Sequence, residues 1–168
     1  MATPGSMPGG EVQKKKVSPK DVFLHLLSTI TLYVSAGALI DLLFGYINTL
    51  FPDALAGSYY VQGMQDSIRF DVSILIIVFP AYLIVNWFLG KSYAAAPEKR
   101  DLRIRKWLVY LTLFLSALIL IGDLVVLVNN LLRGDLATPF VLKVVSVFIV
   151  IGAIFAYYLA DVRKHRTE

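Results

Sequence analysis

The chain has 168 residues, of which 57% are hydrophobic and only 17% are charged, and its formal net charge is +4. One core of a soluble domain of this length could not bury so much apolar sequence, so the composition predicts an integral membrane protein. The absence of cysteine excludes disulfides, thiolate metal sites and cysteine nucleophiles. The basic residues gather near predicted helix ends, and we therefore expect no nucleic-acid partner.

The first element predicted is a disordered basic cytoplasmic tail over residues 1–17, which combine Gly and Pro with a lysine run. Ser18 and Pro19 then resemble a helix start, with Ser as the N-cap and Pro at the first position. Within the predicted first helix, 19–51, the apolar run 22–51 would be about 45 Å long, enough to cross a hydrocarbon layer of about 30 Å. A cleaved signal peptide ending near 34–36 is the alternative that the residues leave open.

The remaining elements follow the apolar runs. Residues 54–65 are interpreted as a loop, and the second helix is predicted over 67–89, with a kink at Pro80. The third and fourth helices are predicted over 98–132 and 139–161. The sequence therefore predicts an all-α transmembrane domain over 18–162, a four-helix bundle, followed by a basic cytoplasmic tail over 163–168.

Orientation follows from the distribution of Lys and Arg. Thirteen of the sixteen basic residues lie in the two tails or in the connection between the second and third helices: Lys14, Lys15, Lys16, Lys20, Lys91, Lys99, Arg100, Arg103, Arg105, Lys106, Arg163, Lys164 and Arg166. The other three, Arg69, Arg133 and Lys143, lie at or near the opposite helix ends. We therefore expect both termini on the cytoplasmic side of the membrane.

Five charged residues within or at the entrance of the spans form the candidate site. Asp41, Asp123 and Lys143 lie inside predicted helices, and Arg69 and Asp71 lie at the entrance of the second. All five belong to the non-cytoplasmic half, where an unpaired charge would be costly. Three acids and two bases at nearby depth can neutralise most of their charge by pairing, which leaves one negative charge or one proton.

Polar stripes at helical spacing support this intramembrane cluster. Asn48 continues a stripe of small and polar residues on the first helix, and Thr112, Ser116 and Asn130 form one on the third. Such stripes most often fix which helices touch, and a solute or ion path is the alternative.

An internal similarity suggests a second description of the fold. TLYVSA at 31–36 is similar to TLFLSA at 112–117, and Asp41-Leu42 is similar to Asp123-Leu124 after one residue of slip. On this alternative interpretation the bundle consists of two tandem helical hairpins with the same topology.

Several motifs together resemble a known family. They are PKDVFL at 19–24, TLYVSA at 31–36, FPD at 51–53, PEKR at 97–100, WLVYLTLF at 107–114, GDL at 122–124 and YYL at 157–159. As a set they are similar to an uncharacterised bacterial family of four-helix membrane proteins, a domain of unknown function (DUF5671-like). The resemblance implies a bacterial cytoplasmic membrane and the same four spans, and it implies no activity or catalytic residues.

Functional motifs are otherwise absent from the sequence. No phosphate-binding loop, metal-ligand spacing or nucleophile elbow is present, so we expect no enzyme activity, no metal and no cofactor. The leading hypothesis is a membrane-embedded interaction or structural subunit, in contact with the lipid bilayer and with a second copy or another membrane subunit. The alternative is a proton- or cation-coupled transporter or channel that uses Asp41 and Asp123.

Overall fold

The computed structural model describes residues 18–52, 55, 57–96 and 102–166, and within them the chain forms four long helices. They are α1 (Pro19–Leu50), α2 (Ser58–Ala95), α3 (Arg103–Arg133) and α4 (Thr138–Arg166). Each is long and apolar enough to cross a membrane. The predicted all-α, four-helix membrane bundle is therefore confirmed. The predicted disordered tail, 1–17, lies outside the described residues.

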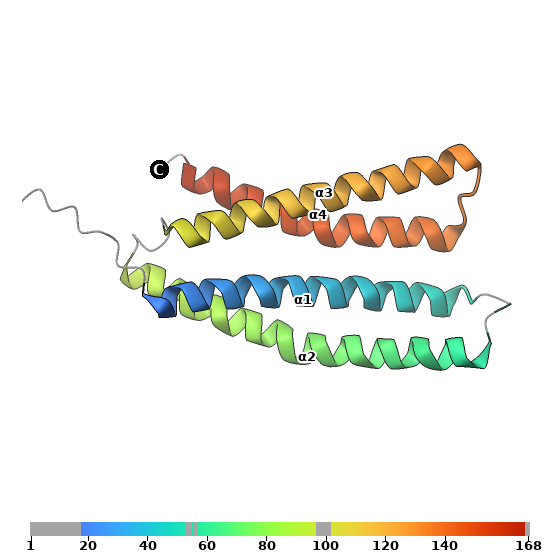
Figure 1. Ribbon diagram of the computed structural model, residues 1–168, viewed down its shortest axis with the longest axis horizontal. Coiled ribbons are helices and arrows are strands. Elements are labelled where there is room, and N and C mark those ends of the chain that lie inside the picture. Colours follow the sequence, from blue (N-terminus) through green and yellow to red (C-terminus); the bar gives the residue numbers. More distant parts are fainter. Residues whose placement is uncertain (1–17, 53–54, 56, 97–101, 167–168) are drawn as a thin grey trace, which may run out of the picture.

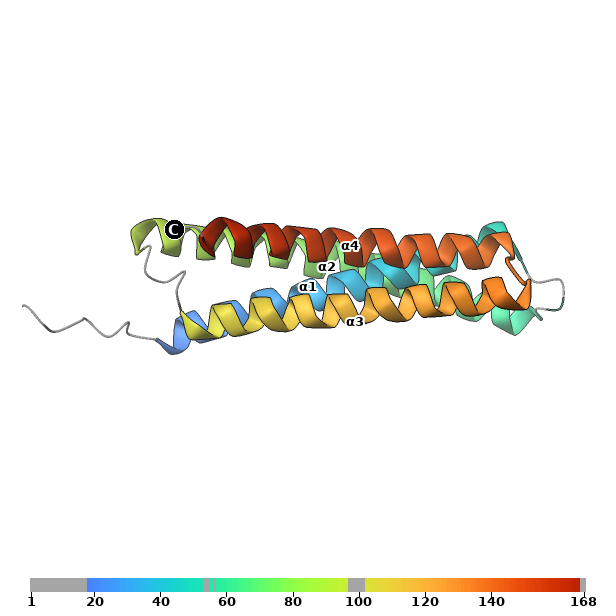
Figure 2. The ribbon, with the colours of Figure 1, turned by 90° about the horizontal axis from the view of Figure 1, so that it is seen from above.

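The bundle consists of two helical hairpins placed side by side, α1 with α2 and α3 with α4 (Figure 1). The turn between α3 and α4 lies at the same end of the bundle as the connection between α1 and α2, and we call this end the turn end (Figures 1 and 2). The opposite end, the terminal end, carries the start of α1 and the end of α4. Both described chain ends therefore lie on one side.

α1 is the central helix of the bundle. It packs against α2, α3 and α4, whereas the backbone of α2 comes close to that of α1 alone among the described helices. The buried face of α1 is rich in polar residues, among them Ser28, Thr31 and Ser35, while large apolar side chains cover the outside of all four helices. This is the reverse of a soluble bundle, and it suits a surrounding of lipid.

Local capping signals set two of the helix ends. Ser18 is the N-cap of α1, where its hydroxyl accepts a hydrogen bond from the Asp21 amide at 3.2 Å, as the sequence predicts. Pro19 follows in the first turn, where a backbone amide would have no carbonyl acceptor within the helix, so the missing proton breaks no hydrogen bond. Gly134 ends α3 in the left-handed region at φ 75°, and the Asp135 amide then donates to the Asn130 carbonyl.

The helix bounds differ from the predicted ones in three places. α2 begins at Ser58, so Tyr59 and Tyr60 are helical and not part of a loop. α2 ends at Ala95, beyond the predicted 89, and α4 continues to Arg166, beyond the predicted 161. Polar residues end a membrane span but do not break a helix. The three added segments contain no proline, and their only glycines are Gly63 and Gly90. The predicted start of the third helix, 98–101, lies outside the described residues.

Pro80 lies inside α2, where its ring nitrogen cannot donate to the Ile76 carbonyl. In Figure 1 the ribbon of α2 changes direction near the middle of the helix, so that its terminal-end half lies closer to the second hairpin. The kink predicted from the proline therefore positions that half of α2.

Candidate functional site

Two of the five predicted charged residues lie together at the contact between α1 and α2. The carboxyl groups of Asp41 and Asp71 are close enough to interact electrostatically, and Ser67 donates to Asp41 Oδ2 at 3.1 Å. Asp71 is only 4% exposed, and its Oδ2 atom receives no hydrogen bond from the residues that the structure describes. The two acids therefore form a pair of like groups, supported by one hydroxyl.

Among the described residues, neither of the two bases forms an ion pair with these two acids. Arg69 forms an ion pair with Asp66 at 3.7 Å, and both side chains are more than 70% exposed. Lys143 places its Nζ atom 5.7 Å from the centre of the Phe44 ring and has no ion pair within 4.0 Å in the described part of the chain. Asp123, on α3, has a buried Oδ2 atom with no hydrogen bond from a described residue.

A cavity of about 340 Å³ adjoins the acidic pair between α1 and α2, and we call it the acidic cavity. Its lining residues are Asp41, Phe44, Gly45, Asn48, Tyr60, Gly63, Met64 and Ser67. Of the predicted polar stripes, Asn48 therefore joins this site. Carboxyl, amide and hydroxyl oxygens together are ligands suited to a proton or a small hard cation.

The predicted stripe on α3 does not line the acidic cavity, and its residue Thr112 forms a hydrogen bond with α1. Thr112 donates to the Leu108 carbonyl at 2.9 Å, and the Tyr33 hydroxyl lies 2.7 Å from Thr112 Oγ1. Since the Thr112 proton is used in its own helix, Tyr33 is the donor, and this bond ties α1 to α3. Ser116 donates to the Thr112 carbonyl, and Asn130 accepts through its backbone carbonyl at the end of α3.

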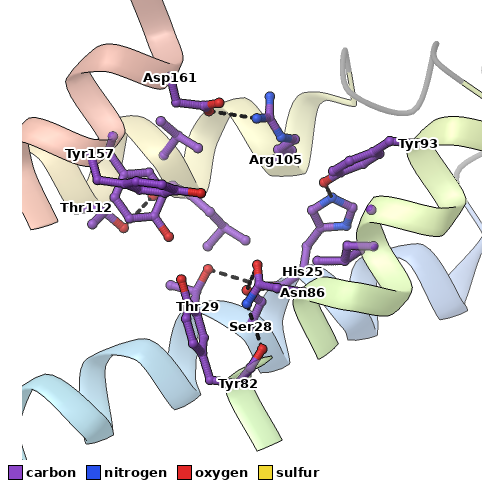
Figure 3. A pocket seen from close by; sticks show the side chains of 15 residues that line it. His25, Ser28, Thr29, Tyr82, Asn86, Tyr93, Arg105, Thr112, Tyr157 and Asp161 are labelled. Carbon is purple, nitrogen blue, oxygen red and sulfur yellow. Dashed lines mark hydrogen bonds and ion pairs between the residues drawn. The ribbon is translucent and has the colours of Figure 1, made fainter. Parts of the chain in front are cut away.

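A second cavity, of about 260 Å³, lies between the two hairpins in the terminal-end half, and we call it the tyrosine pocket (Figure 3). Its lining residues come from all four helices: His25, Ser28, Thr29, Tyr82, Asn86, Leu89, Gly90, Tyr93, Arg105, Leu108, Val109, Thr112, Tyr157, Tyr158 and Asp161. Most are polar or aromatic, which is uncommon for the interior of a membrane bundle.

Hydrogen bonds between α1 and α2 hold one wall of the tyrosine pocket. His25 Nδ1 lies 2.6 Å from the Asp21 carbonyl, and its Nε2 lies 2.6 Å from the Tyr93 hydroxyl. A carbonyl only accepts, so Nδ1 carries a proton and donates to Asp21, while Nε2 and the Tyr93 hydroxyl share the second hydrogen bond. Ser28 donates to Asn86 Oδ1 at 3.2 Å, and Asn86 donates to the Tyr82 carbonyl at 2.7 Å. The polar wall is therefore fixed in orientation.

An ion pair between α3 and α4 forms the opposite wall (Figure 3). Arg105 donates to Asp161 Oδ2 at 2.7 Å, and the two side chains are 16% and 24% exposed. The guanidinium carbon of Arg105 also lies 5.6 Å from the centre of the Tyr93 ring. Arg105 thereby connects the second hairpin to the first.

The tyrosine pocket was not predicted from the sequence. In the sequence, Arg105 is one of the charges that predict orientation, and Asp161 is the last residue of the predicted fourth helix. One signal was available, since Ser28 and His25 are separated by one helical turn and Asn86 lies within an apolar span. Nothing in the sequence alone places these residues opposite Arg105.

Comparison with known proteins gives one match. A family model described as a domain of unknown function, DUF5671, matches residues 21–158, which is most of the chain. No curated protein and no solved structure matches the chain. The expected resemblance is confirmed.

Proposed function

The chain belongs to the DUF5671 family, a domain of unknown function, and we propose that it is a proton- or cation-coupled transporter or channel whose ion site is the acidic cavity. The observation that carries the proposal is the meeting of Asp41 and the buried Asp71 beside a cavity that Asp41 lines. Two carboxyl groups form a hydrogen bond with each other only when one carries a proton, and otherwise they require a cation between them. Either arrangement binds one positive charge.

The distribution of the bases favours this proposal over a purely structural cluster. A structural cluster requires Arg69 and Lys143 to neutralise the acids, but Arg69 is directed to Asp66 and Lys143 to the Phe44 ring. Because an ionised acid in a span costs about 3 kcal/mol at the helix centre, a buried Asp71 without a basic partner suits ion binding better than helix packing.

The location and orientation belong to the same proposal. The chain is a multi-pass membrane protein by helix length and hydropathy. We place it in a bacterial cytoplasmic membrane with the terminal end in the cytoplasm, because all the described basic residues except Arg69, Arg133 and Lys143 lie there. The acidic cavity then lies in the outer half and the tyrosine pocket in the inner half.

A second candidate function is an interaction or structural subunit. It is favoured by the hydrogen bonds that join neighbouring helices, Tyr33 with Thr112 and Ser28 with Asn86, since such bonds stabilise bundles without any transport role. This candidate requires a membrane partner or a second copy, which copurification from a mild detergent would reveal.

Ion flux into proteoliposomes tests the first candidate. Vesicles that contain the purified protein and an internal pH-sensitive dye are given an inside-negative potassium potential, and uptake of protons and of labelled sodium is followed. The wild-type chain is expected to carry one of these ions above the level of empty vesicles. Asp71→Asn removes the ionisable group, and flux is expected to fall to the level of empty vesicles.

Asp66→Asn is the matched control, because Asp66 lies on the same helix five residues earlier but is exposed and paired with Arg69. It should leave the flux unchanged. Wild-type vesicles that carry neither ion, or Asp71→Asn vesicles that carry it as fast as the wild type, would contradict the proposal. In that case copurification of a partner would support the second candidate.

A further inference from the structure

The tyrosine pocket has the size of a site for a small solute. Its volume of about 260 Å³ corresponds to eight or nine waters at about 30 Å³ each, too little for a nucleotide but enough for a small organic molecule. It shares no lining residue with the acidic cavity, so the two are separate sites. Part of its lining, including His25, Asn86, Tyr93 and Arg105, is held in place by the hydrogen bonds already described.

Aromatic rings surround much of this space. Tyr82 and Tyr93 line it from α2, and Tyr157 and Tyr158 line it from α4. The rings of Tyr157 and Tyr158 stand at 89° to each other with centres 5.4 Å apart. Electron-rich tyrosine rings recognise an alkylated ammonium group, and the Tyr93 ring already lies close to the Arg105 cation.

The ion pair in the wall limits the charge of a suitable ligand. Arg105 and Asp161 together carry no net charge, and both are partly accessible. A zwitterion can approach both, with its anionic group on Arg105 and its cationic group near Asp161 and the rings.

We propose that the tyrosine pocket binds a small zwitterion that combines a methylated ammonium group with a carboxylate or phosphate. The tyrosine rings and Asp161 receive the ammonium group, and Arg105 receives the acid group. The site is independent of the ion site proposed above, because its test measures binding and needs no flux. Either proposal can therefore fail alone.

The test uses glycine betaine as the probe. The full chain is placed in nanodiscs of phosphatidylethanolamine and phosphatidylglycerol, which contain no choline, and binding of labelled glycine betaine is measured by equilibrium dialysis. Choline lacks the acid group, and 3,3-dimethylbutanoate replaces the ammonium nitrogen by carbon at the same shape. We expect saturable binding of one betaine per chain, with each analogue competing at least about tenfold more weakly.

Variants locate the binding. Tyr158→Leu and Arg105→Gln are each expected to weaken betaine binding by at least about tenfold. Tyr110→Leu and Arg103→Gln, which change exposed residues of α3 outside the pocket, should have no effect. Each variant is first checked for a helical circular-dichroism spectrum. If Arg105→Gln does not fold, the comparison of betaine with its two analogues on the wild-type chain still tests the charge requirement.

Two further arms distinguish a lipid headgroup from a free solute. Competition by glycerophosphocholine together with loss of betaine binding in phosphatidylcholine nanodiscs would assign the site to the lipid headgroup. Competition by soluble zwitterions alone would assign it to a free solute. The proposal is overturned if neither glycine betaine nor glycerophosphocholine binds, if choline or 3,3-dimethylbutanoate binds as tightly, or if Tyr158→Leu and Tyr110→Leu behave alike.

Discussion

α1 and α2 pack tightly against each other at Gly45. A Cβ atom added there would lie 2.8 Å from Ile68 Cγ1 and 3.2 Å from its Cδ1. Such an overlap forces either the side chain or the helix to move, so we expect Gly45→Ala to lower the free energy of unfolding by about 1–3 kcal/mol. Thermal unfolding in detergent, followed by circular dichroism, measures the loss.

The matched control for Gly45 is Gly37, on the same helix two turns earlier, where an added Cβ meets no atom within 4 Å. Gly37→Ala should be neutral or slightly stabilising, because alanine favours a helix more than glycine does. Ile68→Ala in the Gly45→Ala background should recover part of the loss. Equal unfolding temperatures for Gly45→Ala and Gly37→Ala would show that the close approach does not matter.

Neighbouring residues determine some local features of the helices, whereas the candidate site depends on how the helices pack. The Ser18 cap and the Gly134 turn follow from neighbouring residues, and both were predictable. The predicted five-residue cluster treated Arg69 and Asp71 as neighbours. Residues two apart point about 200° from each other around a helix, so only one of them can face α1. Which one faces it depends on the rotation of α2, which only packing determines.

Pro80 lies within α2, near the point where the helix changes direction. The bend near the middle of this helix brings Tyr82, Asn86 and Tyr93 to the tyrosine pocket (Figure 1). Pro80→Ala restores a backbone donor and is expected to straighten α2, which would move its terminal-end half away from α3. The chain contains no cysteine, so spin labels at Ala94→Cys and Lys106→Cys report this separation without interference.

Pro139→Ala provides the control for the bend. Pro139 lies in the first turn of α4, where a proline breaks no helical hydrogen bond, so the label distance should stay unchanged. An unchanged distance in Pro80→Ala as well would mean that packing against α1, and not the proline, holds the bend.

The existence of all four helices was predictable, because long apolar runs can satisfy their backbone groups in lipid only as helices. The first and last residues of these helices were less predictable. The segment from Ser58 to the apolar part of α2 reads as an interfacial loop, since its tyrosines and glycine are typical of one. Hydropathy measures where the lipid ends and carries little information on where the helix ends.

At the scale of the whole molecule, the proposed orientation makes the two ends chemically distinguishable. In intact cells, Leu136→Cys in the turn between α3 and α4 should react with a membrane-impermeant maleimide added outside. Ala94→Cys, at the terminal end, should react only after the cells are permeabilised. The opposite labelling pattern would reverse the orientation and place the tyrosine pocket on the outer side.

The central place of α1 bears on the order in which the protein can assemble during synthesis. α1 leaves the ribosome first, yet the partners of its polar face arrive later, with Asn86 and Tyr93 on α2 and then Thr112 on α3. Two other hydroxyls of α1 do not depend on a later helix, because Thr29 and Thr31 donate to carbonyls of α1 itself. His25 and Ser28 reach their α2 partners only once the first hairpin has closed. The second hairpin therefore docks onto a surface that the first has already organised.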